Sequence, residues 1–163
     1  MIRIGHGYDV HAFTEGTALR LGGIDVPFSK RFAAHSDGDV LIHALCDAVL
    51  GALALGDIGS WFPDTDPAHA GRDSADFLSL IMSDVRSRGY DLGNADVTVI
   101  AQAPKLRPYI DTMCARVADI AGVCRSQISI KATTTEGLGP MGRGEGIAVH
   151  AVVILQTSET ATA

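Results

Sequence analysis

The stretch AHSDGDVLIHALCDAVLGALALGDIGSWFPDTDP, from Ala34 to Pro67, decides the fold because it joins a helical repeat to polar side chains that can do chemistry. Its apolar residues recur every three or four positions, which predicts a helix from about Ser36 to Leu53. Ser36 followed by Asp39 resembles a capping box in which Asp replaces the usual Glu or Gln. The apolar stripe consists of Leu41, Leu45, Ala48, Val49 and Ala52.

A polar row runs along a second face of this predicted helix. Asp39, His43 and Asp47 are each four residues apart, and residues at that spacing share one helix face. Two interpretations stay open: the row binds a ligand, or the helix dipole favours Asp near the first turn and the His is structural. Gly56–Gly59 is predicted to end the helix, and Trp61–Pro67 reads as an acidic loop with aromatic anchors.

Length and composition indicate one catalytic domain over residues 1–163, with a frayed tail from about 157 to 163. The chain is 47% apolar and 20% charged, which is typical of a folded protein. A formal net charge of −6 argues against a nucleic-acid partner. No run approaches the roughly 18 apolar residues of a membrane span. We also expect no signal peptide, because no apolar segment follows the first six residues.

The cysteines indicate a reducing compartment. Cys46, Cys114 and Cys124 are odd in number and lack zinc-finger spacing, which favours free thiols in the cytoplasm. Cys46 and Cys114 fall within helical patterns, so we interpret them as small core residues and not as nucleophiles.

Alternation and helical spacing along the rest of the chain predict one α/β (α+β) fold. It has a single sheet of about four main strands with helices packed on one face, plus a small β-hairpin. The expected strands are Ile2–Val10, Ala95–Gln102, Ile128–Thr134 and Ile147–Leu155, with a hairpin over Leu19–Pro27. Two further helices are expected. One is capped by Asp73 or Ser74 and runs to about Arg88, and the other begins at Lys105 and is ended by Gly122.

Three residues form a candidate metal site. Asp9 and His11 are two apart, so on a strand both point to the same side. With His43 they supply one oxygen and two nitrogens, the ligand set of catalytic zinc sites that keep a position open. Spacing alone leaves open that these are ordinary surface or core residues.

Two strand ends offer candidate binding loops. Thr133–Glu136 precedes the Gly-rich loop Gly137–Gly146, where hydroxyls, backbone N–H groups and Arg143 would suit phosphate oxygens. Ala101–Lys105 is a second strand-to-helix turn. Both segments could equally be connecting turns.

These residues carry a family resemblance. The motifs are Gly5–His11 (GHGYDVH), Ala34–Asp39 (AHSDGD), Ala54–Gly59 (ALGDIG) with Phe62–Asp66 (FPDTD), Ala101–Lys105 (AQAPK), and Lys131–Glu136 (KATTTE) with Gly142–Gly146 (GRGEG). In this order, from about residue 2 to 155, they resemble 2-C-methyl-D-erythritol 2,4-cyclodiphosphate synthases. Five motifs in register are far more specific than any one of them.

The resemblance implies a phosphorus-oxygen lyase of the non-mevalonate isoprenoid pathway. Its substrate would be 4-diphosphocytidyl-2-C-methyl-D-erythritol 2-phosphate, and its products the cyclic diphosphate and CMP. It implies zinc on Asp9, His11 and His43, and magnesium or manganese bound through Glu136 to the diphosphate. It also implies a homotrimer with active sites between subunits, and no nucleic-acid or membrane partner.

The resemblance further implies roles for individual residues. His35 and Thr134 would stabilise the transition state. Asp9, Val10 and His11 would contact the substrate. The methylerythritol phosphate part would also contact His35, Ser36, Asp57, Ile58, Gly59, Phe62, Pro63, Asp64, Thr65 and Asp66. The cytidine diphosphate part would contact Ala101, Gln102, Ala103, Pro104, Lys105, Leu106, Arg107, Ala132, Thr133, Thr134, Thr135 and Glu136, with Arg143 nearby.

The sequence departs from the family pattern at two positions. Gly137 stands where Lys is common, and Pro140 where an aromatic residue is common, which puts contacts from the Gly-rich loop in doubt. Two other functions stay open. The ligand set would suit a zinc hydrolase, although a general base is not evident outside the acidic cluster. A non-catalytic nucleotide-binding protein with a structural zinc would instead need a fourth protein ligand.

Overall fold

The computed structural model describes residues 1–34, 36–63, 65–66 and 71–158. The strands are β1 (Ile2–Glu15), β2 (Ala18–Leu21), β3 (Ile24–Pro27), β4 (Lys30–Phe32), β5 (Tyr90–Ile100), β6 (Ile128–Thr133) and β7 (Gly146–Thr157). The α-helices are α1 (Val40–Ala52), α2 (Ile58–Trp61), α3 (Ser74–Ser87), α4 (Ile110–Ala121) and α5 (Gly139–Gly142). Short 3-10 turns occur at η2 (Arg107–Tyr109) and η3 (Arg125–Gln127).

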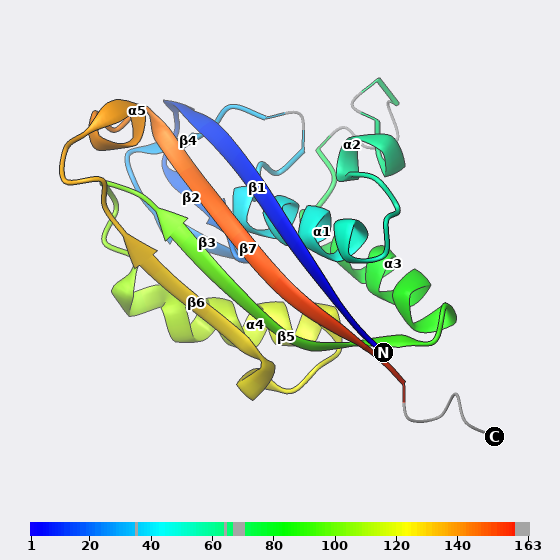
Figure 1. Ribbon diagram of the computed structural model, residues 1–163. Coiled ribbons are helices and arrows are strands. Elements are labelled where there is room, and N and C mark those ends of the chain that lie inside the picture. Colours follow the sequence, from blue (N-terminus) through cyan, green and yellow to red (C-terminus); the bar gives the residue numbers. More distant parts are fainter. Residues whose placement is uncertain (35, 64, 67–70, 159–163) are drawn as a thin grey trace.

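A five-stranded sheet in the order β4-β1-β7-β5-β6 forms one layer, and β2 and β3 pair as a separate hairpin. Strands β5 and β6 are parallel, whereas β7 is antiparallel to both β1 and β5. Helices α1, α3 and α4 pack on one face of the sheet (Figure 1). This confirms the expected sheet, hairpin and one-sided helix layer.

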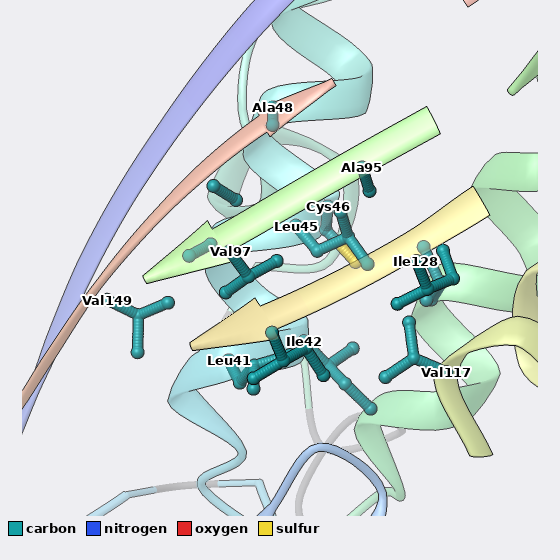
Figure 2. Packing of buried hydrophobic residues seen from close by; sticks show 14 of the residues in the cluster. Leu41, Ile42, Leu45, Cys46, Ala48, Ala95, Val97, Val117, Ile128 and Val149 are labelled. Atoms are coloured by element: carbon teal, nitrogen blue, oxygen red, sulfur yellow. The ribbon is translucent and has the colours of Figure 1, made fainter. Parts of the chain in front are cut away.

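The hydrophobic core lies between the sheet and these helices. Helix α1 is its centre, because every residue of the predicted apolar stripe is buried. Figure 2 shows Leu45 of α1 near Val97 of β5, and Ile128 of β6 near Val117 of α4. Cys46 and Cys114 are buried free thiols, as expected of small core residues.

Strand β1 and helix α1 approach each other until their backbones touch. A Cβ added at Gly5 would lie 1.8 Å from the carbonyl oxygen of Ala48, and one at Gly7 would lie 1.9 Å from that of Ala44. Any side chain at either glycine would therefore push the helix away from the strand. This contact fixes α1 directly behind the stretch of β1 that carries Asp9.

The start of α1 differs from the prediction. The helix begins at Val40, and its N-cap is Asp39, whose side chain accepts a hydrogen bond from the N–H of Ile42. The expected capping box at Ser36 is therefore wrong, because Asp39 itself supplies the capping oxygen. Ser36 instead lies in the loop before the helix, where its hydroxyl accepts a hydrogen bond from the Gly38 N–H.

Other boundaries differ from the prediction by a few residues, while α3 begins after its Asp73 cap as expected. Strand β1 continues to Glu15, and β5 begins at Tyr90 with an irregularity between Leu92 and Asn94 that the alternation pattern did not reveal. Helix α4 begins at Ile110 after a 3-10 turn, later than the predicted Lys105. The short elements β4, α2 and α5 were not predicted, because three or four residues are too few to show a period.

The face of the sheet opposite the helices exposes apolar side chains. Ile2, Ile4 and Tyr8 of β1 are 67%, 69% and 49% exposed, and Val152 of the adjacent β7 is 42% exposed. An antiparallel sheet can expose one face to water, but that face is then usually polar. Rows of large apolar residues on an exposed face are a feature typical of interaction surfaces.

At one end of the sheet, Met1 just before β1 is hydrogen-bonded to the last residue of β7, Thr157. The amino group of Met1 donates a hydrogen bond to Thr157 Oγ1 (2.8 Å), and the Thr157 N–H donates to the Met1 carbonyl (3.0 Å).

Among the described residues, no helix is both long enough and apolar enough to cross a membrane.

The contact of β1 with α1 predicts a large effect of a single methyl group. Gly5→Ala should lower the free energy of unfolding by about 3 kcal/mol, because the new Cβ would displace backbone that cannot move freely. Gly51→Ala is the matched control, since it lies in α1 and its nearest neighbour to a new Cβ is the His6 carbonyl at 4.0 Å. It should be neutral or stabilising by up to about 1 kcal/mol. Urea unfolding measures both, and equal midpoints would refute the close contact.

Candidate metal centre and binding pocket

Asp9, His11 and His43 converge as predicted. Asp9 Oδ2 lies 3.0 Å from His11 Nε2 and 3.4 Å from His43 Nδ1. One donor atom from each residue lies within 4.8 Å of the other two. Strand alternation aims Asp9 and His11 at α1, and the close approach of α1 brings His43 to meet them. Two imidazole nitrogens and one carboxylate oxygen at this spacing suit a divalent cation.

The outer atoms of two of these side chains are already engaged. The carbonyl oxygen of Gly38 lies 2.8 Å from His11 Nδ1. Because a carbonyl can only accept, Nδ1 carries the proton. In the neutral ring Nε2 presents its lone pair to the site, and in the protonated ring Nε2 donates to Asp9 Oδ2. Asp9 Oδ1 accepts a hydrogen bond from the Val10 N–H (2.8 Å), which leaves Oδ2 facing the histidines. Such outer contacts orient metal ligands.

The site favours positive charge. Burial alone would raise the pKa of Asp9, but hydrogen bonds from His11 and His43 and their charges lower it well below its usual range. Burial would likewise lower the pKa of His11, and the neighbouring Asp9 carboxylate raises it instead. An ionised Asp9 between two imidazoles is therefore a half-buried negative centre suited to a cation.

A cavity of about 320 Å³ opens over these ligands, a size that fits a small molecule. Besides Asp9 and His11, its lining includes four further residues that were predicted to bind substrate, namely Ser36, Ile58, Gly59 and Phe62. Sequence reasoning missed Ala33, Ala34, Asp47 and Phe77 as wall residues. The ring of Phe77 stacks on Phe62 with centroids 4.4 Å apart.

The polar row of α1 divides between two tasks. Asp47 is in the wall of the pocket, where its Oδ1 accepts a hydrogen bond from the Ile58 N–H (2.7 Å). Burial, together with the charges of Asp57 and Asp9, raises the pKa of Asp47. Its four-residue spacing from His43 was the signal that could have assigned Asp47 to the pocket.

Asp39, in contrast, is fully buried away from the pocket and holds the fold together. Its Oδ1 accepts hydrogen bonds from the N–H groups of Gly22 and Ile42 (both 3.0 Å), and Oδ2 accepts one from Gly23 (2.7 Å). Burial raises the pKa of Asp39, and the three backbone donors oppose that shift. One carboxylate thus joins the β2–β3 hairpin to the start of α1.

Some predicted substrate residues take other positions. His35 and Asp64 lie outside the described residues. The Val10 side chain is 43% exposed, and alternation along β1 places it on the sheet face opposite Asp9. Asp57 caps α2, with its side chain accepting from the Ser60 N–H. Pro63, Thr65 and Asp66 follow α2 and are not among the residues that line the cavity.

The predicted nucleotide residues gather at the carboxyl ends of β5 and β6. The Ala101 N–H donates to the Thr133 carbonyl (2.9 Å), and the Gly137 N–H donates to Gln102 Oε1 (3.4 Å), so the two loops lie side by side. Around them, Ala103, Lys105 and Arg107 are exposed, and Pro104 and Thr135 are partly buried. Leu106 is only 3% exposed and belongs to the core, so its backbone alone can face a ligand.

Glu136 has an unusual backbone conformation in this loop. Its φ of 53° lies in the left-handed region that non-glycine residues rarely adopt. Thr134 Oγ1 donates to Glu136 Oε1 (3.2 Å) and accepts from the Glu136 N–H (3.2 Å). Arg143 forms an ion pair with Glu145 (2.6 Å). A strained residue held by its neighbours is a feature typical of binding sites.

Within one chain the predicted nucleotide loops lie apart from the candidate metal ligands. Asp9 of β1 pairs with Val149 of β7, which pairs with Val99 of β5. Val99 pairs in turn with Ala132 of β6, two residues before Thr134. Three strand spacings of about 4.8 Å each separate β1 from β6 by about 14 Å. The two groups thus share one end of the sheet without meeting.

The bonds of Asp39 predict that Asp39→Asn will be costly despite its similar shape. An amide has one acceptor oxygen, so at least one buried backbone N–H would face the side-chain NH₂ and lose its partner. The free energy of unfolding should fall by about 1–3 kcal/mol. Asp57→Asn is the control, because that cap is exposed to water and both hydrogen bonds from Ser60 reach Oδ1, so its stability should change little. Denaturant unfolding distinguishes them, and equal stabilities would contradict the assigned role of Asp39.

Known proteins resemble this chain over nearly its whole length. A protein from Thioalkalivibrio sulfidiphilus named 2-C-methyl-D-erythritol 2,4-cyclodiphosphate synthase is 59% identical over 156 residues, which cover 96% of this chain and 98% of the relative. The synthase of that name from Ectopseudomonas mendocina is 59% identical over 154 residues, 94% of this chain and 98% of the relative.

Solved structures share the fold. IspF from Plasmodium falciparum, in a CDP complex, has a TM-score of 0.85 and 35% identity, with 97% of each chain covered. The bifunctional IspDF from Campylobacter jejuni has a TM-score of 0.93 and 43% identity, covering 96% of this chain and 42% of that one. The sequence pattern of the YgbB family matches residues 2–156. Sequence, fold and comparisons together show that the chain belongs to the YgbB family, among relatives named 2-C-methyl-D-erythritol 2,4-cyclodiphosphate synthase.

Proposed function

We propose that this chain is a metal-dependent phosphorus-oxygen lyase that acts on 4-diphosphocytidyl-2-C-methyl-D-erythritol 2-phosphate. The 2-phosphate oxygen attacks the β-phosphorus, the bond from that phosphorus to the oxygen bridging it to the α-phosphate breaks, and CMP leaves with that oxygen. The product is the cyclic diphosphate. The observation that carries the proposal is the Asp9–His11–His43 group under a small-molecule pocket. The chain that carries this group is 59% identical to a protein named 2-C-methyl-D-erythritol 2,4-cyclodiphosphate synthase.

The residues present fit a bound divalent cation. Asp9 Oδ2, His11 Nε2 and His43 Nδ1 offer three converging donors, which we propose hold zinc. Glu136 would hold magnesium or manganese against the diphosphate. Metal ions in such sites neutralise phosphate charge and so reduce the repulsion between anionic reactants. A closed fourth protein ligand would favour a structural zinc, and among the described residues only these three cluster.

The chain itself supplies binding and orientation. The pocket walls, including Ser36 and Gly59, would hold the methylerythritol part folded so that its 2-phosphate reaches the β-phosphorus. We assign transition-state stabilisation to Thr134, whose hydroxyl can donate to a phosphate oxygen, and to His35. The turn after β5 would hold the cytidine part. The CDP complex of the Plasmodium falciparum relative supports a cytidine nucleotide as the ligand class.

We further propose a homotrimer with each active site between two subunits. Two observations support it. Asp9 and His11 lie on β1, and Thr134 follows β6, three strand spacings or about 14 Å away within one chain. A neighbouring chain could therefore bring the second set to the first. The exposed apolar face of β1 and β7 supplies a surface for that association. A ring of three chains would use one heterologous interface three times.

Product analysis tests the proposed reaction. With zinc and magnesium present, phosphorus NMR of the protein incubated with the cytidyl substrate should show CMP and a cyclic diphosphate. Removing metal with a chelator should abolish turnover, and adding zinc and magnesium should restore it. His43→Ala should reduce turnover by about 100-fold or more, because a three-ligand site would lose one donor. Release of inorganic phosphate would instead indicate a zinc hydrolase, and absence of turnover a binding protein.

Subunit mixing tests the shared site. His43→Ala breaks only the metal set, and Thr134→Ala with Lys105→Ala breaks only the nucleotide set. Each variant alone should be nearly inactive. Random reassembly of a one-to-one mixture should restore roughly a quarter of the wild-type sites if the sets come from different chains. If mass spectrometry shows hybrid trimers and the activity of the mixture stays at background, the proposed site between two subunits is contradicted.

A further inference from the structure

The second ring nitrogen of His43 has a buried partner outside the pocket lining. His43 Nε2 lies 2.8 Å from Ser74 Oγ, although the two residues are 31 positions apart. Ser74 is the first residue of α3 and has no exposed surface. Its hydroxyl donates a hydrogen bond of 2.5 Å to Asp37 Oδ1. A chain of three side chains therefore runs from His43 through Ser74 to Asp37.

The direction of these hydrogen bonds follows from counting protons. An ionised carboxylate only accepts, so the single hydroxyl proton of Ser74 goes to Asp37. Ser74 Oγ can then only accept from His43, which places a proton on Nε2. In neutral His43 the lone pair is therefore on Nδ1, the atom that lies 3.4 Å from Asp9 Oδ2.

Asp37 is itself held firmly. The Ser74 N–H donates to its Oδ2 (3.1 Å), and the Asp39 N–H donates to its Oδ1 (3.2 Å). Arg20 Nε lies 3.6 Å from Asp37 Oδ2, and this cation also pairs with Asp73. The backbone donors and the guanidinium hold the carboxylate oxygens in place. The acceptor at the end of the chain is thus fixed in position.

Helix capping does not explain the Ser74 hydroxyl. The N-cap of α3 is Asp73, whose Oδ1 accepts from the Ala75 N–H (2.9 Å). Burying a hydroxyl costs free energy unless it is hydrogen-bonded, and its two side-chain partners are His43 and Asp37. Ser36 Oγ is a longer contact of the same nitrogen (3.3 Å) and already accepts from the Gly38 N–H.

We propose that Ser74 and Asp37 are positioning residues of the metal centre, which fix the ring of His43 with Nδ1 as its metal-binding atom. The Gly38 carbonyl does the same for His11, but there it contacts Nδ1 and leaves Nε2 as the metal-binding atom. Partners of this kind orient metal-binding histidines and commonly account for 10- to 100-fold in metal affinity. The inference rests on the metal site proposed above and adds two residues to it.

Zinc affinity of the metal-free protein tests this, by titration with Zn²⁺ in competition with a chromophoric chelator. Ser74→Ala should weaken Zn²⁺ binding by about 10- to 100-fold, because His43 loses the acceptor that fixes its ring. Asp73→Ala is the matched control, since it removes the cap of the same helix and one carboxylate partner of Arg20 but keeps the side chains of Ser74 and Asp37. It should lower Tm while Zn²⁺ affinity stays within about twofold of the parent.

Asp37→Asn gives a second, gentler test should Ser74→Ala fail to fold. It keeps an oxygen for the Ser74 hydroxyl but removes the charge, so Zn²⁺ affinity should fall by about 3- to 10-fold, a smaller loss than removal of the whole partner. Affinity within twofold of the parent in the folded variant would overturn the inference while leaving the metal site standing. Failure of the parent protein to bind Zn²⁺ would overturn both.

Discussion

The contact between β1 and α1 through Gly5 and Gly7 is the constraint on which the rest of the structure depends. A strand and a helix normally pack through layers of side chains, but here two positions without side chains let helix carbonyls touch the strand. The gain is proximity: Asp9 on the strand and His43 on the helix come within 3.4 Å. A longer strand–helix distance would leave a carboxylate and an imidazole facing water separately. The buried carboxylate of Asp39 then fixes where along the strand the helix starts.

The sequence predicted the parts of the metal centre that depend on local geometry. Alternation along a strand is enough to put Asp9 and His11 on one side, and helical spacing is enough to put His43 on a face of α1. That the strand and the helix meet was an assumption, which the structure confirms. The apolar stripe of α1 and the one-sided helix layer were equally predictable, because burial repeats with the period of each element.

The rest required tertiary structure. The cap of α1 was assigned to Ser36 from a short motif, whereas Asp39 accepts the capping hydrogen bond from the Ile42 N–H. A distant hairpin holds that carboxylate in place through Gly22 and Gly23. Ser74 looked like one of two possible helix caps, and only the fold brings it to His43. The distance between the metal ligands and Thr134 depends on strand order, and periodicity within each strand carries no information about which strand lies next to which.

The pairing of Met1 with Thr157 has a consequence for how such a chain can be built into larger proteins. Both residues lie at the end of the sheet away from the pocket, because β1 runs from Met1 towards Asp9 while β7 returns from beside the pocket to Thr157 (Figure 1). A second domain attached there would not obstruct ligand entry. Adjacent ends at the surface are the geometry that tolerates gene fusion and circular permutation. The Campylobacter jejuni bifunctional protein, of which this chain covers 42%, shows that the fold works as one part of a longer polypeptide.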